Sequence, residues 1–257
     1  MSVINATKLR RLNFIAGFLH LAQGIAVLLL STNFSLPVTG GYLSFNASTK
    51  HLDAASNTLF HLSLPWLVAI FFFLSAVFHL AIATFYRKTY VANLARGINR
   101  ARWFEYSLSA SVMMVAIAML VGIYDAMSLV MIFALAAIMN LSGLAMEVYN
   151  QSASRRDDKI NWLAYKIGSL AGIVPWLAVA FYIGNSNHHG SGAPTFVYFI
   201  FVSIFIFFSC FALNMYLQYK RIGKWADYLY GEKTYIWLSL IAKSLLAWQV
   251  FAGTLRP

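Results

Sequence analysis

Acidic side chains are scarce in this sequence, and charge of either sign is low. Eight of the 257 residues are Asp or Glu, 11% are charged and 60% are hydrophobic, and the mean hydropathy is +0.68. Soluble domains carry about 25% charged residues. The composition therefore excludes a soluble domain and indicates an integral membrane protein.

Cysteine, cleavage signals and repeats are also scarce or missing. The one cysteine, Cys210, excludes a disulfide within the chain, so the compartment cannot be inferred from redox chemistry. The first eleven residues lead directly into an apolar segment without a small-residue cleavage pattern, so we expect the first helix to remain as an anchor. No internal repeat is visible, which argues against a transporter built from duplicated halves.

Seven apolar segments have the length of a membrane span, and the sequence predicts one all-α domain, residues 1–257, built as a seven-helix transmembrane bundle. About 20 residues cross the hydrocarbon core. Backbone amides in hydrocarbon must bond within their own segment, and these runs are too long and too uniformly apolar for barrel strands. The expected helices are 12–34, 65–86, 97–123, 127–148, 162–183, 196–219 and 234–253.

Basic residues fall almost entirely on one side of this arrangement. Sixteen Lys and Arg residues, among them Arg155 and Arg156, lie on the side of the N-terminus, and two, Lys50 and Arg256, lie on the other. The positive-inside rule places the N-terminus in the cytoplasm and the C-terminus outside. This bias and anionic lipid headgroups account for the net charge of +11, so we expect no nucleic-acid binding.

Two connections are predicted on the outer side. The first, about 34–64, has Gly40 and Gly41 beside alternating apolar and polar residues, which favours a short hairpin. The second, residues 184–195, reads as a flexible loop. Its adjacent His188 and His189 could bind a stray metal, but two histidines without further ligands are more often solvated, so we expect no metal site.

Lys243 is the one charged residue of segment 234–253 and stands tenth in it. A lysine at this depth raises the free energy of membrane insertion by at least about 2.5 kcal/mol. Its side chain is also too far from either end of the segment to reach the membrane interface easily, which indicates a functional residue. A lysine amine in an apolar pocket is also the group that condenses with an aldehyde, because desolvation favours its neutral, nucleophilic form.

A buried cation needs a buried anion, and Glu105 is the acidic residue that the sequence places deep enough in a helix. Matching the depth of Lys243 requires the third helix to begin near Ile98 or earlier. An ion pair that merely holds two helices together is the alternative, but buried pairs are weak stabilisers, and function more often explains why they are kept.

Three strings in the chain resemble the heliorhodopsins, a family of retinal-binding membrane proteins: RWFEYSLS (102–109), AGIVPW (171–176) and SLIAKSLLAWQ (239–249). The resemblance covers nearly the whole chain. The inverted topology inferred from the charges is also what this family is known for, so two independent arguments converge.

The resemblance implies that Lys243 carries all-trans retinal as a protonated Schiff base and that Glu105 is its single carboxylate counterion. A protonated imine is a buried cation, and a nearby carboxylate both stabilises it and tunes its absorption. Ser239, four residues before Lys243 on the same helix face, fits a neutral hydrogen-bonding neighbour. For the walls of the chromophore slot, the resemblance points to Tyr106, Met139, Trp176 and Phe208, and also to Trp237 and Trp248. Helix packing or an interfacial belt is the alternative for each of these side chains.

Proton-pumping rhodopsins carry carboxylates at two places where this sequence has Ser239 and Ala116, while Ser109 lies four residues after Glu105. Vectorial transport would therefore lack its proton donor. The candidates for accepting a transiently released proton are His79 and His20, with Ser75 one turn from His79. An internal polar network that shares the proton is the alternative.

Three function classes remain open. We expect a light sensor in the cell membrane, crossing it several times, that changes shape without net ion movement and has no enzymatic activity. A light-driven ion transporter or channel would need a continuous polar path. A membrane enzyme or scaffold without retinal would use Lys243 otherwise. We further expect a homodimer and an unidentified signalling partner, reached through the short loops.

Overall fold

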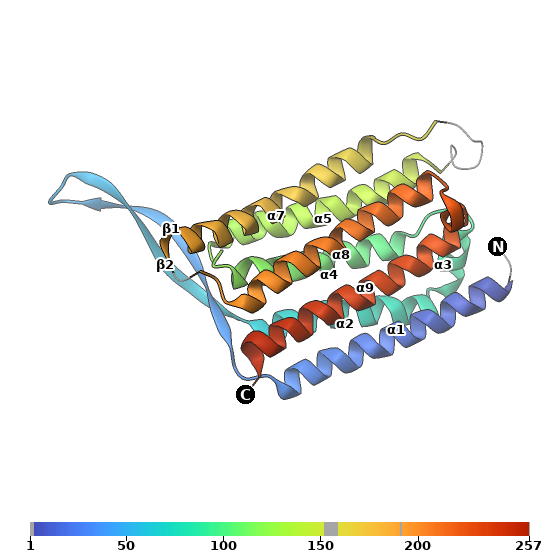
Figure 1. Cartoon of the computed structure of the whole chain (residues 1–257), viewed down its shortest axis with the longest axis horizontal. Coiled ribbons are helices and arrows are strands. Elements are labelled where there is room, and N and C mark those ends of the chain that lie inside the picture. The colour runs from blue at the N-terminus through green and yellow to red at the C-terminus, as the bar shows by residue number, and fades with distance from the viewer. Residues whose placement is uncertain (1–2, 152–158, 191, 257) are drawn as a thin grey trace.

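Long apolar helices form nearly the whole molecule in the computed structural model, which describes residues 3–151, 159–190 and 192–256. Each of seven helices is long and apolar enough to cross a membrane. They lie side by side as one bundle (Figure 1): α1 (Val3–Leu30), α2 (Leu64–Ala83), α4 (Arg100–Leu120), α5 (Ala126–Tyr149), α7 (Leu163–His189), α8 (Thr195–Tyr219) and α9 (Tyr228–Val250). The protein is a multi-pass membrane protein, as the composition predicts.

Several helix ends differ from those expected from hydropathy. α1 ends at Leu30 and not near residue 34, α7 continues to His189, and α9 begins at Tyr228, six residues before the apolar segment. The loop predicted at 184–195 is therefore wrong for its first half, which is helical. A short additional helix, α3 (Arg87–Leu94), lies in the basic connection after α2. Polar residues within a helix lower its mean hydropathy without breaking its backbone hydrogen bonds, so hydropathy alone misplaces such ends.

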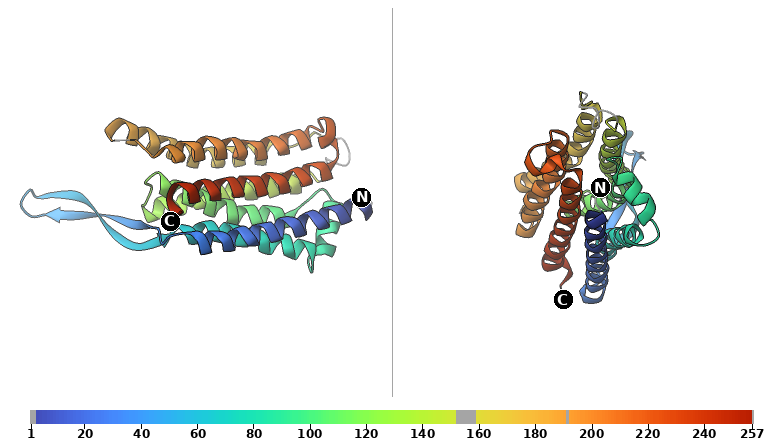
Figure 2. Two further views of the ribbon diagram at one scale, coloured as in Figure 1. Left: turned by 60° about the horizontal axis from the view of Figure 1, so that its bottom comes forward. Right: turned by 90° about the vertical axis from the view of Figure 1, so that its right-hand side faces the viewer.

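The connection between α1 and α2 is a two-stranded antiparallel hairpin, β1 (Ser35–Asn46) and β2 (His51–Ser63). Its strands of 12 and 13 residues are longer than the short hairpin favoured by the sequence. The base of β1 is anchored to the bundle, because Val38 is buried and the Thr39 amide donates to the Tyr124 carbonyl at 2.9 Å. The distal part extends beyond the bundle (Figure 1; Figure 2, left).

The two ends of the bundle differ in character. The end that carries the hairpin also carries the C-terminus, and the N-terminus lies at the opposite end (Figure 1). This opposite end, here called the basic end, holds the starts of α1, α4, α7 and α9, where most of the basic residues are found. Arg155 and Arg156, which belong to the same charge count, lie outside the described residues.

α4 is the most deeply buried of the seven spans, and it packs against α2 and α5 and also contacts α7 and α8. Glycines permit close approach at helix crossings. A Cβ at Gly17 of α1 would lie 2.9 Å from the Leu80 side chain of α2, and one at Gly24 would lie 2.6 Å from the Phe73 ring. Small residues at such crossings allow tight van der Waals packing, which drives helix association in a membrane. The close α1–α2 contact holds these two helices together as one side of the bundle.

Candidate chromophore site

Lys243 and Glu105 meet in the interior of the bundle. The Lys243 Nζ lies 2.7 Å from Glu105 Oε1, and both side chains are nearly fully buried. The ammonium group also lies 5.3 Å from the centre of the Tyr106 ring, a favourable cation–π distance. The structure thus brings together the two charges that the sequence singles out.

The depth argument that led to Glu105 needs correction. α4 begins at Arg100, capped by Asn99, and not near Ile98 or earlier. Glu105 is the sixth residue of α4, and Lys243 is the sixteenth residue of α9. If both helices began at the same height in the bundle, the two backbone positions would be about 15 Å apart along the bundle axis.

Two features reduce this difference. Glu232, the fifth residue of α9, accepts a hydrogen bond from the Asn99 side chain at 2.7 Å, so α9 begins about four residues, or about 6 Å, before α4. Helical side chains point toward the helix N-terminus, and the long Lys243 side chain covers most of the rest. The pair is therefore possible although α4 starts later than expected.

Three serines surround the ion pair. The Lys243 ammonium donates to Ser239 Oγ at 2.7 Å, one turn earlier on α9. Glu105 Oε1 also accepts from Ser109 Oγ at 2.9 Å and lies 2.5 Å from Ser75 Oγ, whose hydroxyl is in reach of the Phe71 carbonyl at 3.0 Å as well. Buried charge is tolerated when hydrogen bonds accompany the pair, and these hydroxyls supply them from α2, α4 and α9.

His79, on α2, and His20, on α1, lie near Glu105. Their rings stack with centroids 5.5 Å apart, and His79 Nδ1 is 2.7 Å from Asn13 Oδ1. Neither ring nitrogen of His20 has a hydrogen-bond partner within the described part of the chain. Asn13 was missed from the sequence, although its spacing of seven residues from His20 places both on one helix face.

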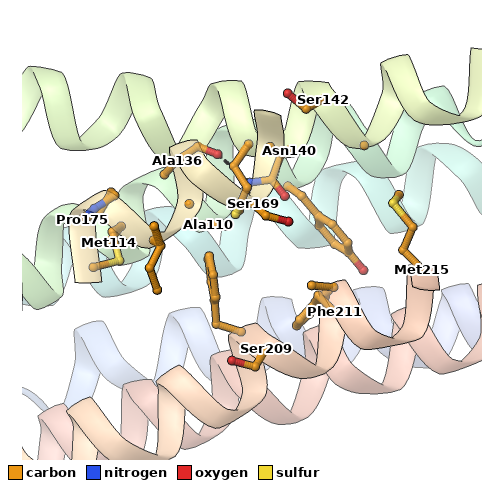
Figure 3. A pocket seen from close by; sticks show the side chains of 18 of the residues that line it. Ala110, Met114, Ala136, Asn140, Ser142, Ser169, Pro175, Ser209, Phe211 and Met215 are labelled. Carbon is orange, nitrogen blue, oxygen red and sulfur yellow. Dashed lines mark hydrogen bonds between the residues drawn. The ribbon is translucent and has the colours of Figure 1, made fainter. Parts of the chain in front are cut away.

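An elongated cavity of about 440 Å³ runs beside the pair, between α4, α5, α7, α8 and α9. On α4 its lining extends from Trp103 to Ile117, about 21 Å along the axis. Figure 3 shows side chains of facing helices pointing into this space, among them Met114, Asn140 and Phe211. Lys243 and Ser239 bring polar atoms to a lining that is mostly apolar.

The wall residues expected from the sequence divide into two groups. Tyr106, Met139, Trp176 and Phe208 line the cavity, and the Trp176 and Phe208 rings meet edge to face with centroids 5.6 Å apart. Trp237 and Trp248 do not line the cavity. Their side chains are 43% and 38% exposed, and the Trp248 indole donates a hydrogen bond to Oε1 of Gln23, on α1, at 3.1 Å. The rotation of α9 about its axis turns both indoles away from the cavity.

The family model for heliorhodopsins matches residues 9–255, nearly the whole chain. The chain belongs to the heliorhodopsin family. A search of the curated proteins found no match. Heliorhodopsins are a light-sensing rhodopsin family and not an enzyme family in the ordinary sense, and membership implies a retinal chromophore.

The cavity of this heliorhodopsin suits retinal in volume, shape and chemistry. Its volume falls in the range of about 300–1,000 Å³ that is usual for small-molecule sites. An elongated apolar space beside one primary amine fits a linear polyene that carries an aldehyde. Gly172 on α7 keeps one wall thin, because a Cβ there would lie 2.6 Å from Met139 Sδ and 2.9 Å from Phe208 Cζ. Any larger residue at this position would displace side chains that line the cavity.

A second buried ionic cluster lies nearer the basic end of the heliorhodopsin bundle, and sequence reasoning missed it. Arg102 of α4 forms salt bridges with Glu147 of α5 and Glu232 of α9. Charged residues near the ends of apolar segments ordinarily lie at the membrane surface, but these three side chains are at most 4% exposed. Glu147 accepts further hydrogen bonds from the Asn99 amide at 2.8 Å, the Trp103 indole at 2.7 Å and the Tyr228 hydroxyl at 3.2 Å.

Proposed function

We propose that this protein is a light-sensing photoreceptor that binds all-trans retinal on Lys243 as a protonated Schiff base, with Glu105 as its counterion. One observation carries the proposal: a lysine amine and a single carboxylate lie 2.7 Å apart, buried beside an apolar cavity. A carboxylate at this distance stabilises a cationic imine nitrogen as it stabilises the ammonium group. Retinal, when bound, would supply the absorption of light and the isomerisation that follows it.

The neighbouring side chains hold this charge arrangement in place. Ser75 and Ser109 fix the Glu105 carboxylate from two helices, and Ser239 faces the nitrogen of Lys243 from one turn below. Any movement of the Lys243 nitrogen away from Glu105 would weaken the electrostatic stabilisation of the proton on that nitrogen. The shape change then acts on helices α4 and α9, which carry the two partners.

A released proton needs a nearby acceptor, and we propose the polar group formed by His79, His20 and Asn13. His79 follows Ser75 by one turn of α2, and the Ser75 hydroxyl contacts Glu105, so one face of α2 carries a partner of Glu105 and the nearer histidine. Histidine changes protonation near neutral pH in an ordinary setting and is suited to temporary proton storage.

Signalling without net transport is favoured over pumping. Among the described residues, the buried carboxylates are Glu105, Glu147 and Glu232, and none lies beyond Glu105 toward the hairpin end. Ala116 is fully buried on α4 at the position where a pump would place its second acid. A proton leaving Lys243 has no carboxylate relay to that end in the described part of the chain.

The charge bias supports a cytoplasmic N-terminus and an external hairpin. We also propose a homodimer that involves the hairpin, because its two strands expose large apolar side chains: Tyr42, Leu43, Phe45, Leu52, Leu59 and Phe60 are each more than half exposed. A signalling partner would then bind at the basic end. Cross-linking of single cysteines placed in β1 would give a covalent dimer if the proposed contact forms, and monomer alone would exclude it.

Replacement of Lys243 tests the photoreceptor proposal directly. Lys243→Ala should be produced and inserted but should form no visible pigment with all-trans retinal. The matched control, Lys166→Ala, removes an exposed lysine and should keep the colour. In the parent protein, borohydride reduction followed by peptide mass spectrometry should find the retinyl group on Lys243. A normal visible band in Lys243→Ala would overturn the proposal.

A further inference from the structure

A second hollow lies at the basic end, between the first turns of α1 and the start of α9, away from the cavity described above. It has a volume of about 500 Å³. Its lining combines basic, aromatic and aliphatic side chains: Lys8, Leu9, Arg11, Leu12, Ile15, Asp227, Leu229, Tyr230, Lys233 and Trp237. We call it the α1–α9 cleft. The chromophore site uses none of these side chains.

Three cations gather in the cleft with little to neutralise them. Lys8 and Arg11 are three residues apart and share one face of α1, and Lys233 faces them from α9. None of the three forms a salt bridge within the described part of the chain. The one carboxylate of the lining, Asp227, caps α9 through its Oδ1, which accepts from the Leu229 amide at 3.0 Å, and this single negative charge leaves two of the three positive charges unbalanced. Like charges held together are unfavourable unless an anion joins them.

The order of side chains along both helices matches the layers of a membrane. On α1 the cations are followed, toward the membrane interior, by Leu12 and Ile15, and on α9 Lys233 is followed one turn later by Trp237. Ile15 and Trp237 are each 43% exposed. An indole on the surface of a span is suited to the headgroup boundary, where one side is polar and the other apolar. The cleft is thus polar at its mouth and apolar below.

We propose that the α1–α9 cleft binds one anionic phospholipid, with the phosphate held by Lys8, Arg11 and Lys233 and an acyl chain lying along Ile15 and Trp237. The recognised chemistry is a phosphate ester. The lipid is favoured over a soluble phosphate because the cleft continues into an apolar surface that a small anion would leave bare. Basic pockets between membrane helices recognise lipid headgroups in this way.

The binding is testable on the whole protein without retinal. Native mass spectrometry of protein from micelles that contain phosphatidylglycerol and phosphatidylcholine should show one retained phosphatidylglycerol. The triple variant Lys8→Gln/Arg11→Gln/Lys233→Gln should bind this lipid on the order of 100-fold more weakly. Each basic residue near the membrane surface contributes roughly tenfold or somewhat less to the affinity for an anionic lipid, and three are removed. The matched control, Lys88→Gln/Arg96→Gln/Arg100→Gln, removes three exposed charges at the same end of the bundle and should bind like the parent protein. Both variants should elute as single folded species, since all six residues are exposed.

Two further measurements separate the outcomes. Phosphatidylglycerol with brominated acyl chains should quench part of the tryptophan fluorescence of the parent protein. This part of the quenching should be absent in Trp237→Phe, which would place the acyl chain of the lipid in the cleft. Glycerol phosphate and inorganic phosphate should not displace the lipid at equal concentration. Equal loss of binding in both triple variants would show a diffuse surface effect and overturn the proposal. Displacement by inorganic phosphate would show a site for small anions and would overturn it as well.

Discussion

Replacing Glu105 with Gln removes one negative charge beside Lys243 while keeping the shape and hydrogen-bonding capacity of the side chain. The two partner atoms are 2.7 Å apart. At an effective dielectric constant of about 20, a unit charge pair at this distance interacts by about 6 kcal/mol. Loss of that energy corresponds to about four pH units in the midpoint of the Schiff-base titration. Rearranged water and Ser239 will offset part of this, so we expect a fall of at least two units.

The remaining protonated pigment should absorb further to the red. A carboxylate near the nitrogen stabilises positive charge at that end of the polyene, and without it the charge spreads along the chain more readily. Visible spectra recorded from acid to alkaline pH measure both effects. Acid titration of the parent protein should produce the same red shift when Glu105 takes up a proton.

Glu147→Gln is the matched control, because Glu147 is equally buried but contacts Arg102 and not Lys243. It should keep the parent absorption maximum. If Glu105→Gln changed neither the maximum nor the titration midpoint, Glu105 would not be the counterion. A bound anion such as chloride would then be the next candidate.

Three other predictions concern topology, transport and the second ionic cluster. A tag at the N-terminus should be protected in intact cells and one at the C-terminus accessible to antibody; the reverse result would discard the assigned orientation. Illuminated cells should show no sustained change in external pH, and a light-driven change abolished by a protonophore would refute the sensor proposal. Arg102→Leu leaves Glu147 and Glu232 buried without their cation and should destabilise the protein by about 3–5 kcal/mol. A thermal melt within a degree of the parent would show that water or another cation replaces Arg102.

The composition and the apolar runs by themselves determined the class of the protein and the number of its spans. Hydrocarbon admits few backbone arrangements, so seven long apolar segments leave little freedom beyond a helix bundle. The same constraint singled out Lys243 and Glu105, because a charge deep in a span is costly and its partner must lie at the same depth. The structure places these two side chains 2.7 Å apart.

Tertiary structure alone decided which polar residues are buried near the basic end. Hydropathy treats Arg102, Glu147 and Glu232 as surface charges, because it averages along the chain and cannot see that three helices bring them together. It also could not tell that Trp176 lines the cavity while Trp237 lines the α1–α9 cleft, since that depends on how each helix is rotated about its axis. Sequence periodicity limits which residues share a face of one helix, but packing between helices decides what each face meets.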